Sequence, residues 1–297
     1  MNTIFYDSTV SDDARRRHLY DGQIHVYSPR SSAVELCNFA RQMCVEAFTP
    51  HDPQTAQYKL PVERFAAILA ELKPKFIHHP TSKMLIQNLL KEMGCDVAKT
   101  YFDVPRLRTS TSDDYLTSGI SYAFHPHRDT WYSAPFCQIN WWMPVYEIVP
   151  ENIMAFHPRY WSQPVRNSSR VYNYQEWNNT SRQNAAQHIK ADTRVQPRPE
   201  EPMELDPQLR VAMPVAGMML FSAAQMHSTV PNTSGRTRFS IDFRTVHLDD
   251  AVARRGAPNI DSACTGTTMG DYLRGPDLAH LPDEVIAMYM DLPTVKR

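Results

Sequence analysis

Residues 138–146 read QINWWMPVY, and their side chains alternate between two kinds. The odd-numbered positions are all apolar, whereas the even-numbered positions hold amides, aromatic rings and a proline. Residues 236–245, RTRFSIDFRT, alternate in the same way, with arginine, serine and aspartate among the even positions. Because successive side chains of a strand point to opposite faces, both segments are predicted to be β-strands with one dry face. The second face then lies either in water or inside a polar barrel.

The rest of the chain sets the predicted fold class. From about residue 98 onward, short β-type runs are separated by proline, asparagine, serine and glycine, which is typical of a sandwich or jelly roll. Before that point, three segments have the apolar spacing of helices, at 32–48, 61–76 and 81–94. We therefore predict a mainly β fold with flanking helices: a double-stranded β-helix barrel, of the jelly-roll or cupin-like type, covered by N-terminal α-helices. Strands are expected near 121–125, 136–146, 153–157, 210–213, 218–222 and 237–246.

The helix expected at 81–94 shows the clearest end signals. Thr81 or Ser82 is suited to cap its start, because a hydroxyl oxygen accepts a hydrogen bond from a free backbone N–H of the first turn. Gly94 is suited to end it in the left-handed conformation.

A chain of 297 residues is long enough to form one large domain around its own core. We expect a single domain, with a helical part at about 1–97, a jelly-roll core at about 98–247 and a C-terminal helical extension at about 248–297. Residues 150–210 are the least regular part of the core and are rich in arginine, asparagine, glutamine and tyrosine. Long loops inside compact domains tend to be functional, so this insert is interpreted as a lid.

Composition excludes several kinds of partner. The net charge of -1 provides no basic surface for nucleic acid. The five cysteines are scattered without zinc-site spacing and are interpreted as reduced thiols. Neither a signal-type apolar run at the N-terminus nor a membrane span is visible, which leads us to expect a soluble cytoplasmic protein. No pattern in the sequence indicates an oligomeric state.

A His-x-Asp tripeptide at His127-Arg128-Asp129 is the first candidate for a metal site. On a strand, side chains at i and i+2 share a face about 6.5 Å apart, so an imidazole and a carboxylate can bind one metal ion. A second histidine from a distant strand would complete the two-histidine, one-carboxylate set that suits Fe(II). His125 is the alternative to His127 as a ligand.

The tripeptide alone is weakly specific, because His247-Leu248-Asp249 has the same form. The residues downstream of each copy separate the two. About a hundred residues after the first copy comes His227, and Arg238 lies eleven residues beyond it. After the second copy only His280 remains.

The order and spacing of His127, Asp129, His227, Arg238 and Ser240 resemble the Fe(II)/2-oxoglutarate-dependent dioxygenases, most closely their phytanoyl-CoA-dioxygenase-like branch. The resemblance covers about residues 98–247. It implies that the two histidines and the aspartate hold Fe(II), and that the arginine and serine bind the distal carboxylate of the cosubstrate 2-oxoglutarate. A guanidinium suits that second task, because it grips a carboxylate through two parallel hydrogen bonds.

Two further amides belong to the predicted cofactor site. Gln138 and Asn140 face the predicted lumen by alternation and are candidates to touch 2-oxoglutarate or iron-bound water. One segment departs from the family pattern: where the branch usually has Asn-Gly leading to Pro-Gly-Ser-His, this chain has ENIMAFHPRYW at 151–161.

The resemblance also implies an activity. Halogenating relatives replace the aspartate by a small residue, so the presence of Asp129 favours hydroxylation. With dioxygen as oxidant, the expected reaction hydroxylates an unactivated C–H bond of a small polar metabolite, either an amino acid derivative or a natural-product intermediate, and releases succinate and CO2.

Substrate contacts are expected from Trp142, Arg159, Arg236 and Arg244. Each has an alternative role. Trp142 is also suited to the core, and Arg236 and Arg244 to salt bridges with residues such as Asp242. The arginines of the insert form either a solvated surface or part of the lid.

Two other functions fit the same residues. A cupin-like metalloenzyme would keep the barrel and the metal but oxidise a chelating substrate without 2-oxoglutarate, and would form no succinate. A jelly-roll module without enzymatic activity would use the arginine-lined lumen to hold an anionic ligand, and would bind no iron.

Overall fold

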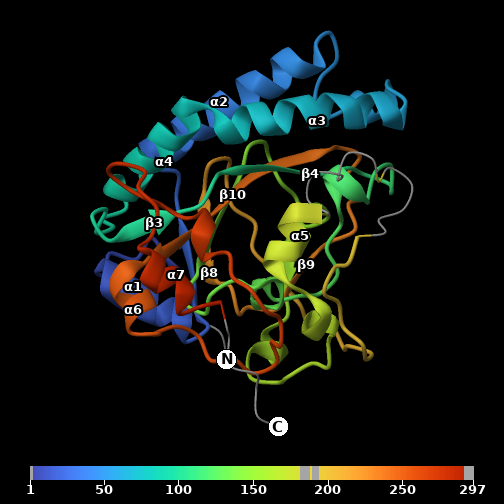
Figure 1. The fold of residues 1–297 in the computed structure, drawn as a ribbon. Coiled ribbons are helices and arrows are strands. Elements are labelled where there is room, and N and C mark those ends of the chain that lie inside the picture. The colour runs from blue at the N-terminus through green and yellow to red at the C-terminus, as the bar shows by residue number, and fades with distance from the viewer. Residues whose placement is uncertain (1–2, 181–187, 189–193, 291–297) are drawn as a thin grey trace.

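The computed structural model describes residues 3–180, 188 and 194–290, and their strands form two sheets (Figure 1). The larger sheet has the strand order β1-β2-β8-β5-β10-β3-β11, with β4 also paired to β10, and the smaller has the order β7-β6-β9. The strand pairs are antiparallel except β1 with β2. The strands of the larger sheet are β1 (Ile4–Tyr6), β2 (Ile24–Tyr27), β3 (Thr100–Phe102), β4 (Arg106–Ser110), β5 (Ile139–Pro144), β8 (Met218–Ser222), β10 (Arg238–His247) and β11 (Leu273–Arg274), and those of the smaller are β6 (Met154–Phe156), β7 (Leu209–Arg210) and β9 (His227–Thr229).

Three helices cover one face of the larger sheet: α2 (Ser31–Phe48), α3 (Val62–His78) and α4 (Pro80–Glu92) (Figure 1). They confirm the three helices predicted from the sequence. Gly94 ends α4 with φ +68°, as expected. The predicted cap is wrong, however: the backbone N–H of Thr81 donates to Nδ1 of His79, because Pro80 already occupies the first helical position.

The helices and the sheet enclose the main core. The odd-numbered side chains of β5 and β10 point into it, and the rings of Trp141 and Phe243 stack at 5.3 Å. The predicted dry faces are therefore confirmed. The even-numbered side chains point to the other face, where Asn140 and Arg238 are buried. A second apolar cluster, including Trp142 and Phe156, lies between the two sheets.

The two sheets thus face each other with a polar region between them, and the mainly β fold with flanking helices is confirmed. Among the described strands no backbone pairing joins the two sheets. Barrel closure therefore stays a prediction.

Four of the six located strands are confirmed, as β5, β6, β8 and β10, whereas the strand predicted at 210–213 shares only Arg210 with β7. The strand predicted at 121–125 is wrong. A 3-10 turn at Gly119–Ser121 precedes this segment, and Pro126, which has no N–H for a ladder, follows it. The insert at 150–210 contains β6, β7 and α5 (Tyr174–Thr180), and its residues 181–187 and 189–193 lie outside the described part.

The remaining helices are short. α1 (Asp12–Tyr20) packs near β2 and β8. Between residues 248 and 290, the C-terminal part contains α6 (Leu248–Val252) and α7 (Asp283–Ala287), with a 3-10 helix at Met269–Asp271 and β11 between them. Of the helices in the described part of the chain, none has the length and apolar character that crossing a membrane requires.

Candidate metal centre

The backbones of His127 and His227 pair directly with each other in an isolated antiparallel bridge. The N–H of each residue donates to the carbonyl of the other, at 2.9 and 3.0 Å. Since His227 opens β9, the bridge places His127 beside the edge of the smaller sheet. The centroids of the two imidazole rings are 4.3 Å apart. Two backbone hydrogen bonds thus hold together two histidines that are about a hundred residues apart in the sequence.

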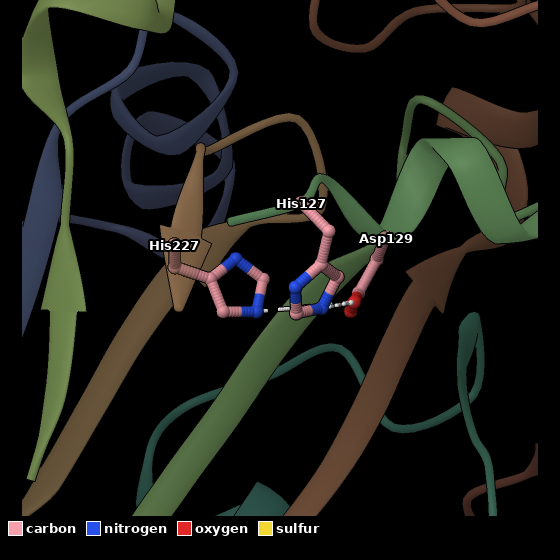
Figure 2. Close-up of side chains that lie close together, drawn as sticks. All are labelled: His127, Asp129 and His227. Atoms are coloured by element: carbon pink, nitrogen blue, oxygen red, sulfur yellow. Dashed lines mark ion pairs between the residues drawn. The ribbon is translucent and has the colours of Figure 1, made fainter. Parts of the chain in front are cut away.

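Asp129 reaches the same point from a turn. The tripeptide was expected on a strand, but Asp129 opens a short 3-10 helix, Asp129–Tyr132. Its Oδ1 lies 3.5 Å from Nε2 of His127 and 3.9 Å from Nε2 of His227. Figure 2 shows the three side chains pointing toward one another. One candidate ligand atom from each lies within 4.8 Å of the others.

Backbone carbonyls orient both imidazole rings. Nδ1 of His127 lies 2.8 Å from the carbonyl of His125, and Nδ1 of His227 lies 3.0 Å from that of Gln225. Because a carbonyl only accepts, each Nδ1–H donates and each Nε2 presents its lone pair to the shared point. Burial and the neighbouring His127 lower the pKa of His227 to about 4, so that its ring is neutral at pH 7. The imidazole of His125 is exposed and does not belong to this group.

Two amides hold the other oxygen of Asp129. Nδ2 of Asn140 donates to Oδ2 at 2.8 Å, and Nε2 of Gln138 donates to the same atom at 3.2 Å. Burial alone would raise the pKa of Asp129, but the neighbouring His127 and the charge of Arg244 outweigh it and hold that pKa far below its usual range. The carboxylate is therefore ionised. Its Oδ2 accepts hydrogen bonds from the two amides, and its Oδ1 faces the two imidazole rings. The two amides contact Asp129 directly, a role that the sequence did not indicate.

Arg238 carries a buried charge on the inner face of β10. Its Nη1 donates to the carbonyl of Asn152 at 3.0 Å, and its guanidinium lies 5.7 Å from the ring centroid of Trp142. No described carboxylate lies within ion-pair distance of it, and its Nε is buried without a hydrogen-bond partner among the described residues. The hydroxyl of Ser240 is likewise buried without a partner in that part of the chain. Burial and the charge of Arg108 lower the pKa of Arg238 to about 10, which leaves it charged at pH 7.

The other predicted site residues divide into two groups. Trp142 and Arg244 line the same cavity as the three candidate ligands, and Arg244 pairs with Asp103 at 3.2 Å. Arg159 and Arg236 do not line it. Arg159 pairs with Glu204 at the surface, and Arg236 is exposed beside a separate, smaller cleft.

The cavity itself has a volume of about 1890 Å³. One part of its lining is charged and includes Arg108, Arg238 and Asp242. Another part is a row of aromatic rings in successive contact, and the second ring of the row stacks on the imidazole of residue 127. The row consists of Tyr122, Phe124, Tyr132, Tyr172 and Trp177, with neighbouring centroids between 4.9 and 6.3 Å apart.

Sequence reasoning missed the residues that fix the His127–Asp129 segment in place. Arg128 is buried, and its Nε donates to Oδ2 of Asp261 at 3.0 Å. The indole N–H of Trp131 donates to the other oxygen of Asp261 at 2.8 Å. Arg128 lies between two candidate ligands in the sequence, so its side chain points away from them and into the protein. A buried guanidinium there predicts a buried acidic partner. The pattern does not indicate which acid that is.

No family model matches the sequence, and no curated protein sequence matches it. Several solved structures are similar to the chain. The non-heme α-ketoglutarate-dependent epimerase SnoN from nogalamycin biosynthesis is 13% identical, with 80% of this chain and 84% of that chain covered, at a TM-score of 0.40. EvdO2 from Micromonospora carbonacea var. aurantiaca, complexed with 2-oxoglutarate, is 11% identical over 81% and 92% of the two chains, at 0.44. The non-heme monooxygenase ThoJ is 12% identical over 74% and 71%, at 0.38. The superfamily that the sequence resembles, and the branch within it, therefore stay predictions.

Proposed function

We propose that this chain is a non-haem oxygenase that uses Fe(II) and 2-oxoglutarate to hydroxylate an unactivated C–H bond of a small molecule, with release of succinate and CO2. The observation that carries the proposal is the convergence of two imidazole Nε2 atoms and one carboxylate oxygen in a buried site. These three donors come from a turn and from a strand that lies a hundred residues away. Such a set binds a non-haem Fe(II) and leaves coordination positions open.

The donors fit a metal ion chemically. His127 and His227 present lone pairs, and the free oxygen of Asp129 carries negative charge, so a cation satisfies all three. His127, Asp129 and His227 would hold Fe(II) through Nε2, Oδ1 and Nε2. Iron held there supplies the activation of dioxygen that couples the decarboxylation of 2-oxoglutarate to hydroxylation.

The surroundings of Arg238 fit the cosubstrate. Its guanidinium has a free Nε, and the hydroxyl of Ser240 is a second donor on the same face of β10. A carboxylate that accepts from both would pair with a charge that has no acidic partner within ion-pair distance in the described part of the chain. The ring of Trp142 lies against the guanidinium and restricts its orientation. We therefore assign the distal carboxylate of 2-oxoglutarate to Arg238 and Ser240.

The cavity supports a substrate larger than an amino acid. Pockets for drug-sized ligands usually measure about 300–1,000 Å³, and this one holds about 1890 Å³. Its aromatic row provides ring faces and edges against which a ring-bearing molecule can pack. Of the two predicted substrate classes, we favour a polar natural-product intermediate that carries rings. Of the four predicted substrate contacts, Trp142 and Arg244 line this cavity, whereas Arg159 and Arg236 lie outside it.

We also propose that the two facing sheets are the halves of a double-stranded β-helix, and that the chain forms one domain. The polar faces of β5 and β10 on one side, and β9 on the other, then enclose the reaction site. The insert would act as its lid and exclude water.

The decisive experiment adds Fe(II) and then 2-oxoglutarate to the metal-free protein without oxygen. We expect a visible charge-transfer band that requires both additions, and succinate formation once oxygen and a substrate are admitted. Asp129→Ala should lose the band. Asp249→Ala is the matched control, because Asp249 ends the second His-x-Asp tripeptide but is paired with Lys99 at the surface.

Two other outcomes would each indicate a different function. Iron binding without any effect of 2-oxoglutarate would indicate the cupin-like metalloenzyme. Binding of an anionic ligand without iron would indicate the non-enzymatic module. A band that persists in Asp129→Ala would contradict the assignment of that carboxylate.

A further inference from the structure

We propose that Tyr272 is a positioning residue for the metal centre: through the amide of Gln138, it fixes which oxygen of Asp129 faces the two imidazoles. This inference rests on the proposed function, because it concerns the same three donors. It adds a residue from the C-terminal part of the chain, more than a hundred positions away from Asp129, which neither the sequence pattern nor the resemblance indicates.

The proposal depends on an unbroken chain of side-chain hydrogen bonds. The Tyr272 hydroxyl donates to Oε1 of Gln138 at 2.7 Å. Nε2 of Gln138 then donates to Oδ1 of Asn140 at 2.8 Å and to Oδ2 of Asp129 at 3.2 Å. Asn140 closes the set by donating to the same Oδ2 at 2.8 Å. Tyr272, Gln138 and Asn140 are at most 5% exposed, so water has little access to these groups.

The Tyr272 hydroxyl determines which atoms donate and which accept in these hydrogen bonds. Burial raises the pKa of Tyr272 far above its usual value, so the hydroxyl keeps its proton and donates. It therefore requires the carbonyl oxygen of the Gln138 amide, which leaves only the NH2 group to face Asp129. Without this hydroxyl, the amide is held only at its NH2 end, by Asn140 and Asp129, and its buried carbonyl oxygen loses the partner that positions it.

Fixing Oδ2 determines what Oδ1 can do. With two amide donors on Oδ2, the carboxylate cannot rotate to offer both oxygens to a metal without breaking these bonds. Oδ1 is the oxygen for which the structure shows approaches of 3.5 and 3.9 Å to the two Nε2 atoms. The hydroxyl of Tyr272 thus preorganises a single-oxygen ligand. Loss of such outer partners typically weakens metal binding about 10- to 100-fold.

The test is a titration of the metal-free protein with Co(II), without any substrate or cosubstrate. Co(II) reports both affinity and ligand geometry through its visible absorption. We expect Tyr272→Phe to bind Co(II) about 10-fold more weakly than the unaltered protein, with a changed spectrum. Gln138→Met removes the amide at similar size and should have a similar effect. The double variant should lose little more than either single variant, because both remove one chain of contacts.

Tyr289→Phe is the matched control. Tyr289 is also a buried tyrosine of the C-terminal part, and its hydroxyl donates to the carbonyl of Ala251 at 2.8 Å. Its hydroxyl also lies 3.9 Å from Sγ of Cys137, but none of its described contacts reaches the side chains of residues 138 and 140 or Asp129. Its variant should therefore bind Co(II) as the unaltered protein does. Thermal unfolding of each variant shows whether the fold is intact, and Gln138→Met keeps the test possible if Tyr272→Phe does not fold.

The outcomes separate the two proposals. If the unaltered protein binds no Co(II), the proposed metal centre fails, and this inference fails with it. If the unaltered protein binds Co(II), and Tyr272→Phe or Gln138→Met binds it equally well with the same spectrum, only the role of Tyr272 is overturned. Additive losses in the double variant would also overturn it, since they would show that the two side chains act separately.

Discussion

Among single residues, Arg238 and Arg244 share the inner face of β10 but differ in their surroundings. Arg244 has carboxylates at 3.2 Å in Asp103 and at 3.9 Å in both Asp129 and Asp242. Arg238 has none within ion-pair distance among the described residues. Burying an unpaired charge lowers the stability of a fold, and breaking a buried pair lowers it as well. The two arginines are therefore expected to respond in opposite ways when they are replaced.

We predict that Arg238→Met keeps or raises the melting temperature and abolishes binding of 2-oxoglutarate. The substitution removes a charge whose burial already lowers its pKa. Arg244→Met should instead cost about 1.5–3 kcal/mol, because it removes one of the two arginines that donate to the buried carboxylate of Asp103, the other being Arg106. Thermal and urea unfolding measure the stability of both variants, and calorimetric titration of the metal-loaded protein measures the binding of 2-oxoglutarate. A clear loss of stability in Arg238→Met would show that its charge is already compensated.

A second residue makes stability depend on pH. The ring of His25 lies against those of Phe5 and His18, at centroid distances of 4.8 and 5.4 Å. Burial, followed by the charges of His18 and Arg15, lowers its pKa from 6.5 to about 4. Between these two values the unfolded chain binds a proton that the folded chain does not. Stability therefore falls as the pH falls from 6.5 to 4, and this contribution is absent above 6.5.

We expect His25→Gln to show a smaller loss of unfolding free energy across that pH window than the unaltered protein. Urea unfolding at pH 4.5 and at pH 7 supplies the two values for each protein. His280→Gln, at an exposed histidine, is the comparison. Equal slopes for His25→Gln and the unaltered protein would contradict the effect.

At the level of elements, the 3-10 turn that carries Asp129 depends on one ion pair. Asp261 accepts from Arg128 and from Trp131, and its side chain is only 4% exposed. The backbone N–H of Val165 donates to it as well, at 3.1 Å. One carboxylate thus joins the turn, the insert and the C-terminal part of the chain.

We predict that Asp261→Ala lowers the free energy of unfolding by about 3–5 kcal/mol, because it leaves the Arg128 guanidinium buried and unpaired. Urea denaturation measures the loss. Asp277→Ala removes an acid from an exposed pair with Arg274 and should leave the urea midpoint nearly unchanged. Similar midpoints for both variants would show that the buried pair does not stabilise the turn.

The elements show how far sequence patterns lead. Long periodic segments such as α2 and α3, and alternating ones such as β5 and β10, were predicted correctly because their pattern follows from burying one face. β2 was missed because all four of its residues are buried, which removes the alternation. The amide clamp on Asp129 could not be predicted either. Alternation showed which way Gln138 points, but the partner it meets depends on a turn whose geometry no periodic pattern encodes.

For the whole molecule, the two sheets divide the proposed site between them. His127 and His227 lie at the smaller sheet, whereas Arg238 and Asn140 belong to the larger one. A cosubstrate that touches both the metal and Arg238 therefore links the sheets. A ligand that binds only the folded form adds about 2.7 kcal/mol of stability at a hundred times its dissociation constant.

We predict that a divalent metal raises the melting temperature, and that 2-oxoglutarate raises it further only when metal is present. Differential scanning calorimetry with Ni(II), which avoids oxidation, checks both steps. Arg238→Met should keep the first increase and lose the second. An increase with 2-oxoglutarate alone would place the cosubstrate away from the metal.

The reciprocal pair of peptide hydrogen bonds between residues 127 and 227 has a consequence for how the centre gains and loses its ion. The main chain, and not the long side chains, sets how far apart the two imidazole rings stand. We therefore expect the empty and the loaded protein to share the same arrangement there, so that capture involves little ordering of the polypeptide. A chelator should then remove the metal ion without unfolding the residues that bind it, and addition of fresh metal should restore the original occupancy.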